Sequence, residues 1–343
     1  MKWVALFPGQ GSQHVGMGKE LFDNFGKARE VFEEASDAAH VDLKKLCFDG
    51  PESDLTLTEN TQPCLLTASV AAFRVAQTEF GFTPSVVAGH SLGEYSALAA
   101  AGSIRLSSSS AWVRERGRAM QKAVPSGQGT MAAVMGLDDS MIAGLCTRAT
   151  TIAIEKRAKG ENADLTVEAV VEPANFNSPG QIVIAGSTDA VGEAVALIKA
   201  GIEFPGGKAI PLTVSAPFHC KLMKPARDRM AELFALATAA ERARQPICPY
   251  IPNRTARATQ EAGAVFELLI EQVDHPVLWK QSMAGLLESD EITAIEFGPG
   301  KVLSGLLKRI AQPMGLKTPP VMASLNDLSS VQAFEKTWKG ITK

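Results

Sequence analysis

Residues 85–101 read Ser-Val-Val-Ala-Gly-His-Ser-Leu-Gly-Glu-Tyr-Ser-Ala-Leu-Ala-Ala-Ala. The run Ser85–Ala88 predicts a short buried strand, and Tyr95–Ala101 predicts the helix that follows it. Between them, residues 89–93 have the G-x-S-x-G spacing of a nucleophile elbow, whose glycines permit a strained turn that raises the serine hydroxyl above the sheet. A strand, a tight turn and a helix in this order favour a parallel α/β sheet. The stretch therefore predicts Ser91 as a nucleophile, against the alternative of a purely structural turn.

The segments around this stretch extend the α/β pattern. Lys2–Phe7 is a buried-strand pattern that ends at a glycine-containing loop, residues 8–13. Thr61 and Pro63 are typical of a helix start, and a helical apolar pattern follows over 65–76. A further strand is predicted over 293–297.

A second region, from about residue 127 to residue 201, has a different order of elements. Its expected order is strand, helix, strand, strand, helix, strand, which is that of the ferredoxin-like split unit. The polar stretch 155–164 is expected to be a solvated loop. We thus expect a catalytic body over 1–126 and 202–343, interrupted by a small α+β subdomain over 127–201. The elements expected in and after the insert are strand 131–135, helix 138–146, strand 167–171, strand 181–185, helix 188–199 and a strand ending at Val214.

The composition excludes several classes of protein. The 343 residues are 45% apolar and 21% charged, close to the soluble globular average. The formal net charge of −3 argues against non-specific nucleic-acid binding, which needs a basic face. No apolar run approaches the roughly 18 residues of a membrane span. The five scattered cysteines have no C-x-x-C pair, which argues against a zinc ribbon and for a reduced, cytoplasmic location. We expect a monomer.

A nucleophilic serine needs a base, and histidine is the usual one. By itself His219, which follows a strand pattern and Pro217, could equally be a packed histidine, but elimination favours it as the base. Cys220 is a rival nucleophile, although buried cysteine is the commoner role. The four histidines set aside are His14 in a polar loop, His40 after an acidic helix, His90 beside the elbow and His275 in a turn before a proline.

An acyl-transfer site also needs two donors for the oxyanion. Gln10, in the loop after the first strand, and Leu92, at the start of the helix after Ser91, are the candidates through their backbone N–H groups. A phosphate-binding interpretation of the same loop lacks both the full G-x-G-x-x-G pattern and a Walker lysine.

Six motifs, in order along the chain, closely resemble those of the malonyl-CoA:acyl carrier protein transacylases. The resemblance runs from residue 3 to about residue 330, and it implies an α/β-hydrolase-like body with a parallel sheet and a ferredoxin-like insert. The motifs are Phe-Pro-Gly-Gln-Gly-Ser-Gln (7–13), Gly-His-Ser-Leu-Gly-Glu-Tyr (89–95), Arg-Gly-Arg-Ala-Met-Gln (116–121), Asn-Phe-Asn-Ser-Pro-Gly-Gln (175–181), Pro-Phe-His-Cys (217–220) and Phe-Gly-Pro-Gly-Lys (297–301).

The resemblance also implies roles for single residues. Ser91 is similar to the acylated nucleophile of the family and His219 to its general base, with Gln10 and Leu92 as the oxyanion donors. Arg116 matches the arginine that pairs with the free malonyl carboxylate, a task suited to a guanidinium that is always charged and binds in two parallel hydrogen bonds. Without the resemblance Arg116 would be assigned to a helix surface.

Three further positions complete the expected site. Gln272 matches the residue whose main-chain carbonyl orients the histidine, and Asn177 is a pocket candidate. Phe218 departs from the serine often found there in bacterial single-domain members, which leaves the acyl specificity open. The polar stretch 148–166 is longer than is usual.

The resemblance implies malonyl-CoA as substrate and acyl carrier protein as partner, with no metal and no tightly bound cofactor. The basic residues after the histidine are candidates for a rim that contacts an acidic carrier, or they form an ordinary solvated helix face. Three alternatives share parts of this pattern: a trans-acting acyltransferase of a polyketide synthase, a serine esterase or thioesterase, which would not need Arg116, and a non-catalytic binding protein. The basic residues are Lys221, Lys224, Arg227 and Arg229.

Overall fold

The computed structural model describes residues 2–162, 164–289 and 291–341, and the chain divides into two compact units. The first unit comprises Met1–Arg118, Leu233–Phe266 and Ser282–Lys343, and the second comprises Ala119–Glu232 and Glu267–Gln281. The expected insert, 127–201, lies inside the second unit, which extends past it at both ends.

The first unit contains a five-stranded sheet in the order β7-β2-β1-β8-β9, and every neighbouring pair is parallel. The predicted parallel sheet is therefore confirmed, and so are the strands expected near both ends of the chain. The outer strands β7 and β9 were not expected, because β7 has only two residues and β9 is largely half-exposed. The strands are β1 (Lys2–Phe7), β2 (Val86–Gly89), β7 (Tyr250–Ile251), β8 (Ile292–Phe297) and β9 (Val321–Leu325).

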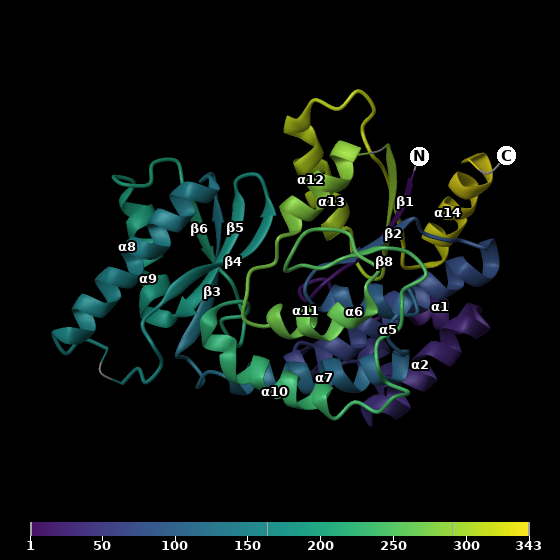
Figure 1. Ribbon diagram of the computed structural model, residues 1–343, viewed down its shortest axis with the longest axis horizontal. Coiled ribbons are helices and arrows are strands. Elements are labelled where there is room, and N and C mark those ends of the chain that lie inside the picture. The colour runs from purple at the N-terminus through teal and green to yellow at the C-terminus, as the bar shows by residue number, and fades with distance from the viewer. Residues whose placement is uncertain (1, 163, 290, 342–343) are drawn as a thin grey trace. The chain divides into compact units, whose positions relative to one another are not determined.

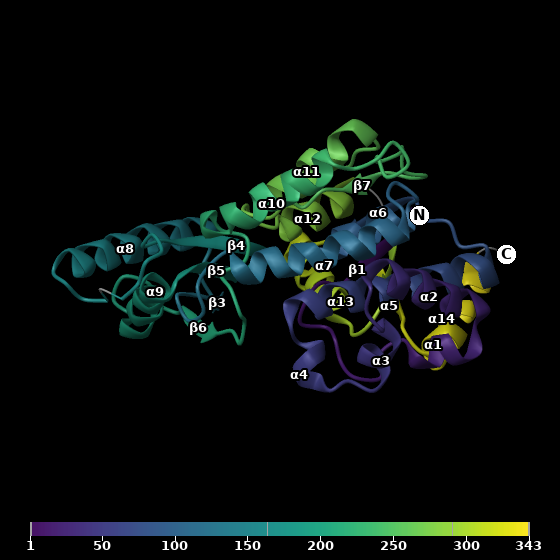
Figure 2. The same cartoon turned by 90° about the horizontal axis from the view of Figure 1, so that it is seen from below.

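The long helix α5 (Thr58–Phe80) is buried over most of its 23 residues, because α1 to α4 and α6 pack around it (Figure 2). It begins three residues before the expected start, so Pro63 lies inside the helix. One missing N–H costs a single hydrogen bond, and burial of the surrounding apolar side chains outweighs that loss. The other helices of this unit are α1 (Lys19–Asn24), α2 (Gly26–Ala39), α3 (Leu43–Phe48), α4 (Glu52–Leu55), α6 (Leu92–Ala100), η2 (Ala262–Ala264), α13 (Val302–Ala311), η3 (Gln312–Met314) and α14 (Leu328–Ile341).

Aromatic side chains hold the carboxyl ends of the central strands in the first unit. Phe7 and Phe297, the last residues of β1 and β8, stack with ring centroids 5.9 Å apart. Phe73 of α5 contacts both rings, at 5.9 Å and 5.3 Å. Each side chain is fully buried, and burial of a phenylalanine stabilises a fold by about 1.5–3 kcal/mol. This cluster fixes the sheet edge from which the loops of the site leave.

The second unit contains a four-stranded antiparallel sheet in the order β4-β5-β3-β6. Its elements follow the expected order of strand, helix, strand, strand, helix, strand. Helices α8 and α9 pack against each other and on the sheet (Figure 1), and their apolar side chains form the core of the unit. The elements are β3 (Gly129–Met135), α8 (Asp139–Ala158), β4 (Val171–Ser178), β5 (Gln181–Ser187), α9 (Thr188–Ala200), β6 (Lys208–Pro211) and η1 (Lys221–Met223).

Three expectations for this unit were wrong. The stretch 155–164 is not all loop, because α8 continues to Ala158, where Lys156 and Arg157 form ion pairs with Glu193 and Asp189 of α9. Ala163 lies outside the described residues.

The second error concerns β4, which begins at Val171, where the expected strand ended. Its pairing with β5 has register shifts at Pro173/Asn175 and Phe176/Ser178, so its sequence lacks the two-residue alternation of a regular strand. A proline is tolerated there because β4 lies at an edge of the sheet.

The third error concerns the strand expected to end at Val214. Strand β6 ends at Pro211, and the Val214 N–H donates to the Leu212 carbonyl oxygen in a tight turn.

Four helices contain the boundaries between the units along the chain. They are α7 (Leu106–Lys122), α10 (Lys224–Ala235), α11 (Val265–Glu271) and α12 (Trp279–Ser289).

Within the described part of the chain, no helix is both long and apolar enough to cross a membrane. All five cysteines are free and buried.

Candidate active site

The elbow around Ser91 has the strained geometry that its glycines predict. Ser91 joins β2 to α6 with φ 52° and ψ −109°, a conformation that side chains of L-residues rarely adopt. A Cβ atom on Gly89 would lie 1.9 Å from the backbone of Gly93. One on Gly93 would lie 2.0 Å from the carbonyl oxygen of Phe7. Both glycines are therefore required for α6 to begin this close to β1 and β2.

The parallel register places the loop after β1 beside the elbow. Phe7 is paired with Gly89, and the His90 N–H donates to the Phe7 carbonyl oxygen at 3.0 Å. The Gln10 side chain is anchored by donating from Nε2 to Thr58 Oγ1 at 3.3 Å. Leu92 is the first residue of α6, where an N–H has no acceptor within its own helix. The structure thus gathers Ser91 and both oxyanion candidates in the first unit.

Arg116 is buried beside the serine and is not a surface residue of α7. Only 1% of it is exposed. Its Nη1 donates to Gln62 Oε1 at 2.8 Å and its Nη2 to Ser91 Oγ at 3.2 Å. The guanidinium also lies over the ring of Tyr95, 5.6 Å from the centroid. Burial lowers the pKa of Arg116 from its usual value.

The neighbouring arginines of α7 point elsewhere. Arg118 forms ion pairs with Glu59 and Glu115, and Arg114 donates to the Ala39 carbonyl oxygen at 2.5 Å. Successive positions of a helix differ by about 100°, so residues two apart face different sides. Arg116 is therefore the member of this basic run that reaches Ser91, a distinction that composition alone does not make.

His219 and Gln272 are in contact within the second unit. His219 is 3% exposed and has a φ of 61°. Its Nδ1 lies 2.9 Å from the backbone oxygen of Gln272, a buried residue directly after α11. A carbonyl oxygen only accepts, so Nδ1 carries the proton and Nε2 is left as the basic nitrogen. This is the tautomer that a general base needs.

The flanking residues limit the alternatives for this segment. Cys220 Sγ donates to the Pro217 carbonyl oxygen at 3.1 Å, and burial raises the pKa of the thiol to about 12. The thiol is therefore protonated near neutral pH, which removes the rival nucleophile. Phe218 is buried beside His219, and Asn177 is half-buried on β4.

The basic residues after His219 are each paired with a carboxylate of the second unit. Three of these ion pairs are largely exposed and contribute little to stability, whereas Asp274, the partner of Arg227, is only 8% exposed. They support an ordinary solvated helix face over an unpaired basic rim. The pairs are Lys221 with Glu168, Lys224 with Asp228, Arg227 with Asp274 and Arg229 with Glu232.

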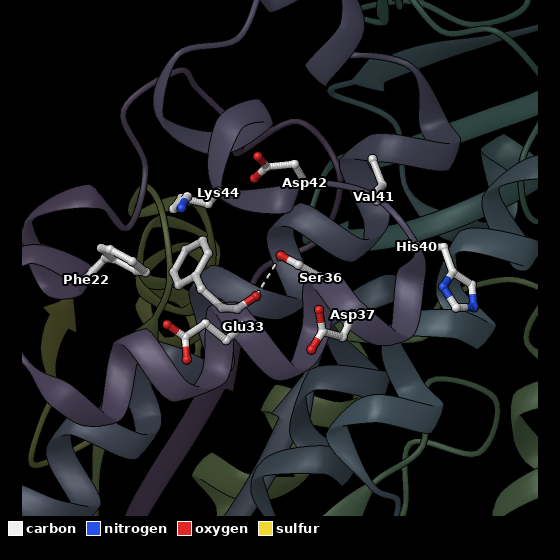
Figure 3. A pocket seen from close by; sticks show the side chains of 9 residues that line it. Phe22, Glu33, Ser36, Asp37, His40, Val41, Asp42 and Lys44 are labelled. Carbon is white, nitrogen blue, oxygen red and sulfur yellow. Dashed lines mark hydrogen bonds between the residues drawn. The ribbon is translucent and has the colours of Figure 1, made fainter.

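A pocket of about 670 Å³ lies elsewhere in the first unit, among α1, α2 and α3 (Figure 3). Its lining combines the apolar Phe22 and Val41 with charged residues such as Asp37 and Lys44. No predicted site residue is among those that line it. The pocket is therefore separate from the chemistry at Ser91.

Comparisons with known proteins place this geometry in a family. The family model described as the acyl transferase domain matches residues 4–315. The chain belongs to the acyl transferase domain family. This acyltransferase is 44% identical over 314 residues to the malonyl CoA-acyl carrier protein transacylase of Salmonella typhimurium, covering 91% of this chain and 94% of that protein. The resemblance inferred from the six motifs is confirmed.

Solved structures agree with this assignment. An acyl-carrier-protein S-malonyltransferase from Burkholderia pseudomallei superposes with a TM-score of 0.86 at 40% identity, covering 98% of this chain and 100% of that one. A malonyl-transacylase in complex with a type II PKS acyl-carrier protein superposes with a TM-score of 0.84 at 40% identity, with coverage of 98% and 100%. The alternative of a non-catalytic binding protein is therefore set aside.

One residue of the elbow was not predicted from the sequence. Asn253, two residues after β7, contacts both the Ser91 N–H and the Gly89 carbonyl oxygen through its side chain. The only available signal was an Asn after an apolar run and a proline, Tyr250-Ile-Pro-Asn253, which is as typical of an ordinary turn.

Proposed function

We propose that this acyltransferase moves the malonyl group of malonyl-CoA to the phosphopantetheine thiol of acyl carrier protein through a malonyl-serine intermediate, as a step of fatty acid biosynthesis. The observation that carries the proposal is the buried guanidinium of Arg116, 3.2 Å from Ser91 Oγ. A fixed positive charge beside the nucleophile favours an acyl group with its own carboxylate. A simple esterase has no use for this charge.

The reaction has two half-reactions at the same serine. His219 Nε2 takes the proton of Ser91 Oγ as the oxygen attacks the thioester carbonyl carbon of malonyl-CoA. The backbone N–H groups of Gln10 and Leu92 hold the resulting oxyanion. When the intermediate collapses, the C–S bond breaks and coenzyme A leaves with the proton from His219, which leaves malonyl-Ser91.

The second half-reaction reverses these roles with a new thiol. His219 takes the proton of the phosphopantetheine thiol, and the sulfur attacks the ester carbonyl of malonyl-Ser91. Collapse breaks the C–O bond and returns the proton to Ser91 Oγ. The Gln272 carbonyl keeps the proton on Nδ1, so Nε2 serves both steps. Asn177 and Phe218 are proposed to line the acyl pocket.

We also propose the finer description of the architecture, an α/β-hydrolase-like body with a ferredoxin-like subdomain over 127–201. The parallel sheet with an elbow after β2 supports the first part, and the element order of the second unit supports the second. The free, buried cysteines are those of a protein in a reducing compartment, for which we propose the cytoplasm. We also propose that the protein is a monomer.

Trapping the acyl-enzyme tests the function. The protein is mixed with malonyl-CoA alone, its intact mass is measured, and the modified peptide is mapped. We expect one malonyl group on Ser91 and its loss when holo acyl carrier protein is added. Release to water without transfer would point to a hydrolase. Carriers from fatty-acid and polyketide systems, compared at equal concentration, distinguish the two classes of transferase.

A further inference from the structure

A buried asparagine bridges the two sides of the elbow within the first unit. Asn253 is 1% exposed. Its Oδ1 accepts from the Ser91 N–H at 2.6 Å, and its Nδ2 donates to the Gly89 carbonyl oxygen at 2.6 Å. An N–H can only donate and a carbonyl can only accept, so this pairing fixes which end of the amide is oxygen.

A third hydrogen bond fixes the bridge itself. The Asn253 N–H donates to Oε2 of Glu94, a buried residue in the first turn of α6, at 3.0 Å. The strand β7 before Asn253 pairs with β2, the strand before Ser91. Asn253 is thus attached to the elbow through its strand, its backbone and its side chain.

The elbow needs such support because its backbone is strained. The φ and ψ of Ser91, 52° and −109°, lie outside the regions favoured for L-residues. Conformations of this kind cost roughly 1–3 kcal/mol and persist only where the surroundings hold them. The Asn253 amide joins the peptide groups on both sides of His90, so a relaxed turn would break both of its hydrogen bonds.

The hydrogen bond from the Ser91 N–H to Asn253 also determines which backbone N–H of this turn can serve the oxyanion hole. Because the Ser91 N–H is directed to Asn253, it is not available to a substrate oxygen. The next N–H, that of Leu92, is left at the start of α6, where the helix dipole adds to its effect. The orientation of Ser91 therefore decides both where Oγ points and which N–H faces the oxyanion.

We propose that Asn253 is a positioning residue that holds the nucleophile elbow in its reactive conformation. This inference rests on the proposed role of Ser91. A residue that acts through the geometry of the nucleophile should change the rate of acylation and not the affinity for malonyl-CoA. A displacement of about 1 Å at a reacting atom can reduce a rate roughly 100-fold.

The test compares two variants of similar size. Asn253→Leu removes both side-chain hydrogen bonds, and Asn253→Asp keeps the acceptor but loses the donor to Gly89. Asn326→Leu, at another loop amide of the first unit, is the matched control. We expect single-turnover acylation of Ser91 by malonyl-CoA to fall roughly 10- to 100-fold in both Asn253 variants and to stay within twofold in the control.

Affinity and folding are measured separately. The Kd for malonyl-CoA is determined in a Ser91→Ala background, with and without each Asn253 substitution, and we expect it to change less than threefold. Thermal melting identifies a variant that does not fold, in which case the other variant decides. Acylation at the wild-type rate, or a loss fully explained by a weaker Kd, would overturn the proposal. Failure of the wild-type protein to become acylated at Ser91 would instead overturn the proposed function.

Discussion

Ser91 and His219 both lie at positive φ, at 52° and 61°, yet their segments are held in different ways. The elbow of the first unit is crowded by neighbouring backbone, since neither Gly89 nor Gly93 has room for a Cβ atom, and the Asn253 side chain bridges it as well. The His219 segment of the second unit has no glycine and is held by side chains, through the bonds of His219 to Gln272 and of Cys220 to Pro217. Crowded backbone requires glycines at a fixed spacing, which can be recognised in the sequence. Anchoring by side chains requires no such pattern.

The largest expected effect comes from removing the chemistry of either segment. Ser91→Ala should reduce malonyl transfer roughly 10⁴-fold or more, because nucleophile and base act as a unit. For the same reason, His219→Ala should cost little when added to Ser91→Ala. Single and double variants are compared with malonyl-CoA and holo acyl carrier protein. Near wild-type transfer in either single variant would contradict the Ser-His assignment.

Crowding at the elbow predicts a large effect on folding. Gly93→Ala places a Cβ atom 2.0 Å from the Phe7 carbonyl oxygen, which is backbone and cannot rotate away. We expect a loss of about 4 kcal/mol or more in the free energy of unfolding, measured by chemical denaturation. Gly305→Ala is the control, because its Cβ atom would meet nothing within 4 Å on α13 and should stabilise the protein by about 0.5–1 kcal/mol. Equal stability of the two variants would show that the elbow can move.

A substitution of Arg116 tests whether specificity for the acyl group depends on the first unit, which holds this arginine. Arg116→Ala should cost malonyl transfer about 2–4 kcal/mol, through loss of a buried charge-assisted contact. Acetyl-CoA has no free carboxylate, so its transfer should fall much less. Arg118→Ala, which removes half-exposed ion pairs, should cost under about 1 kcal/mol with either substrate. A loss that is the same for both substrates would mean that Arg116 is structural.

The two segments also show what sequence reasoning can reach. The elbow was predictable residue by residue, because a sharp strand-to-helix turn requires glycines at fixed positions. His219 emerged only by elimination and Gln272 only through the resemblance, since a carbonyl oxygen belongs to every residue and has no side-chain signature. Asn253 was missed because its partner Ser91 is 162 residues away and β7 is too short to be recognised. Strand β4 was misplaced because its irregular pairing breaks the alternation on which strand prediction depends.

The smallest expected effect concerns Phe218, the residue before His219. Its ring is buried, and we propose that it forms one wall of the acyl pocket. A rigid ring leaves little room for a substituent on the α-carbon of the acyl group, so malonyl should be preferred over methylmalonyl. One methyl group supplies only about 1–3 kcal/mol of discrimination, which bounds the preference.

Phe218→Ser should reduce the preference for malonyl over methylmalonyl. It enlarges the acyl pocket and leaves the backbone N–H donors of the oxyanion hole unchanged. The ratio of kcat/KM for the two thioesters is measured in the wild-type and variant proteins. Phe176→Ser, on β4 of the same unit, is a control for the loss of a partly buried ring near Lys280. If side-chain packing holds the His219 segment in place, Phe218→Ser should also slow malonyl transfer. An unchanged ratio together with a slower rate would assign Phe218 to holding His219 and remove it from the acyl pocket.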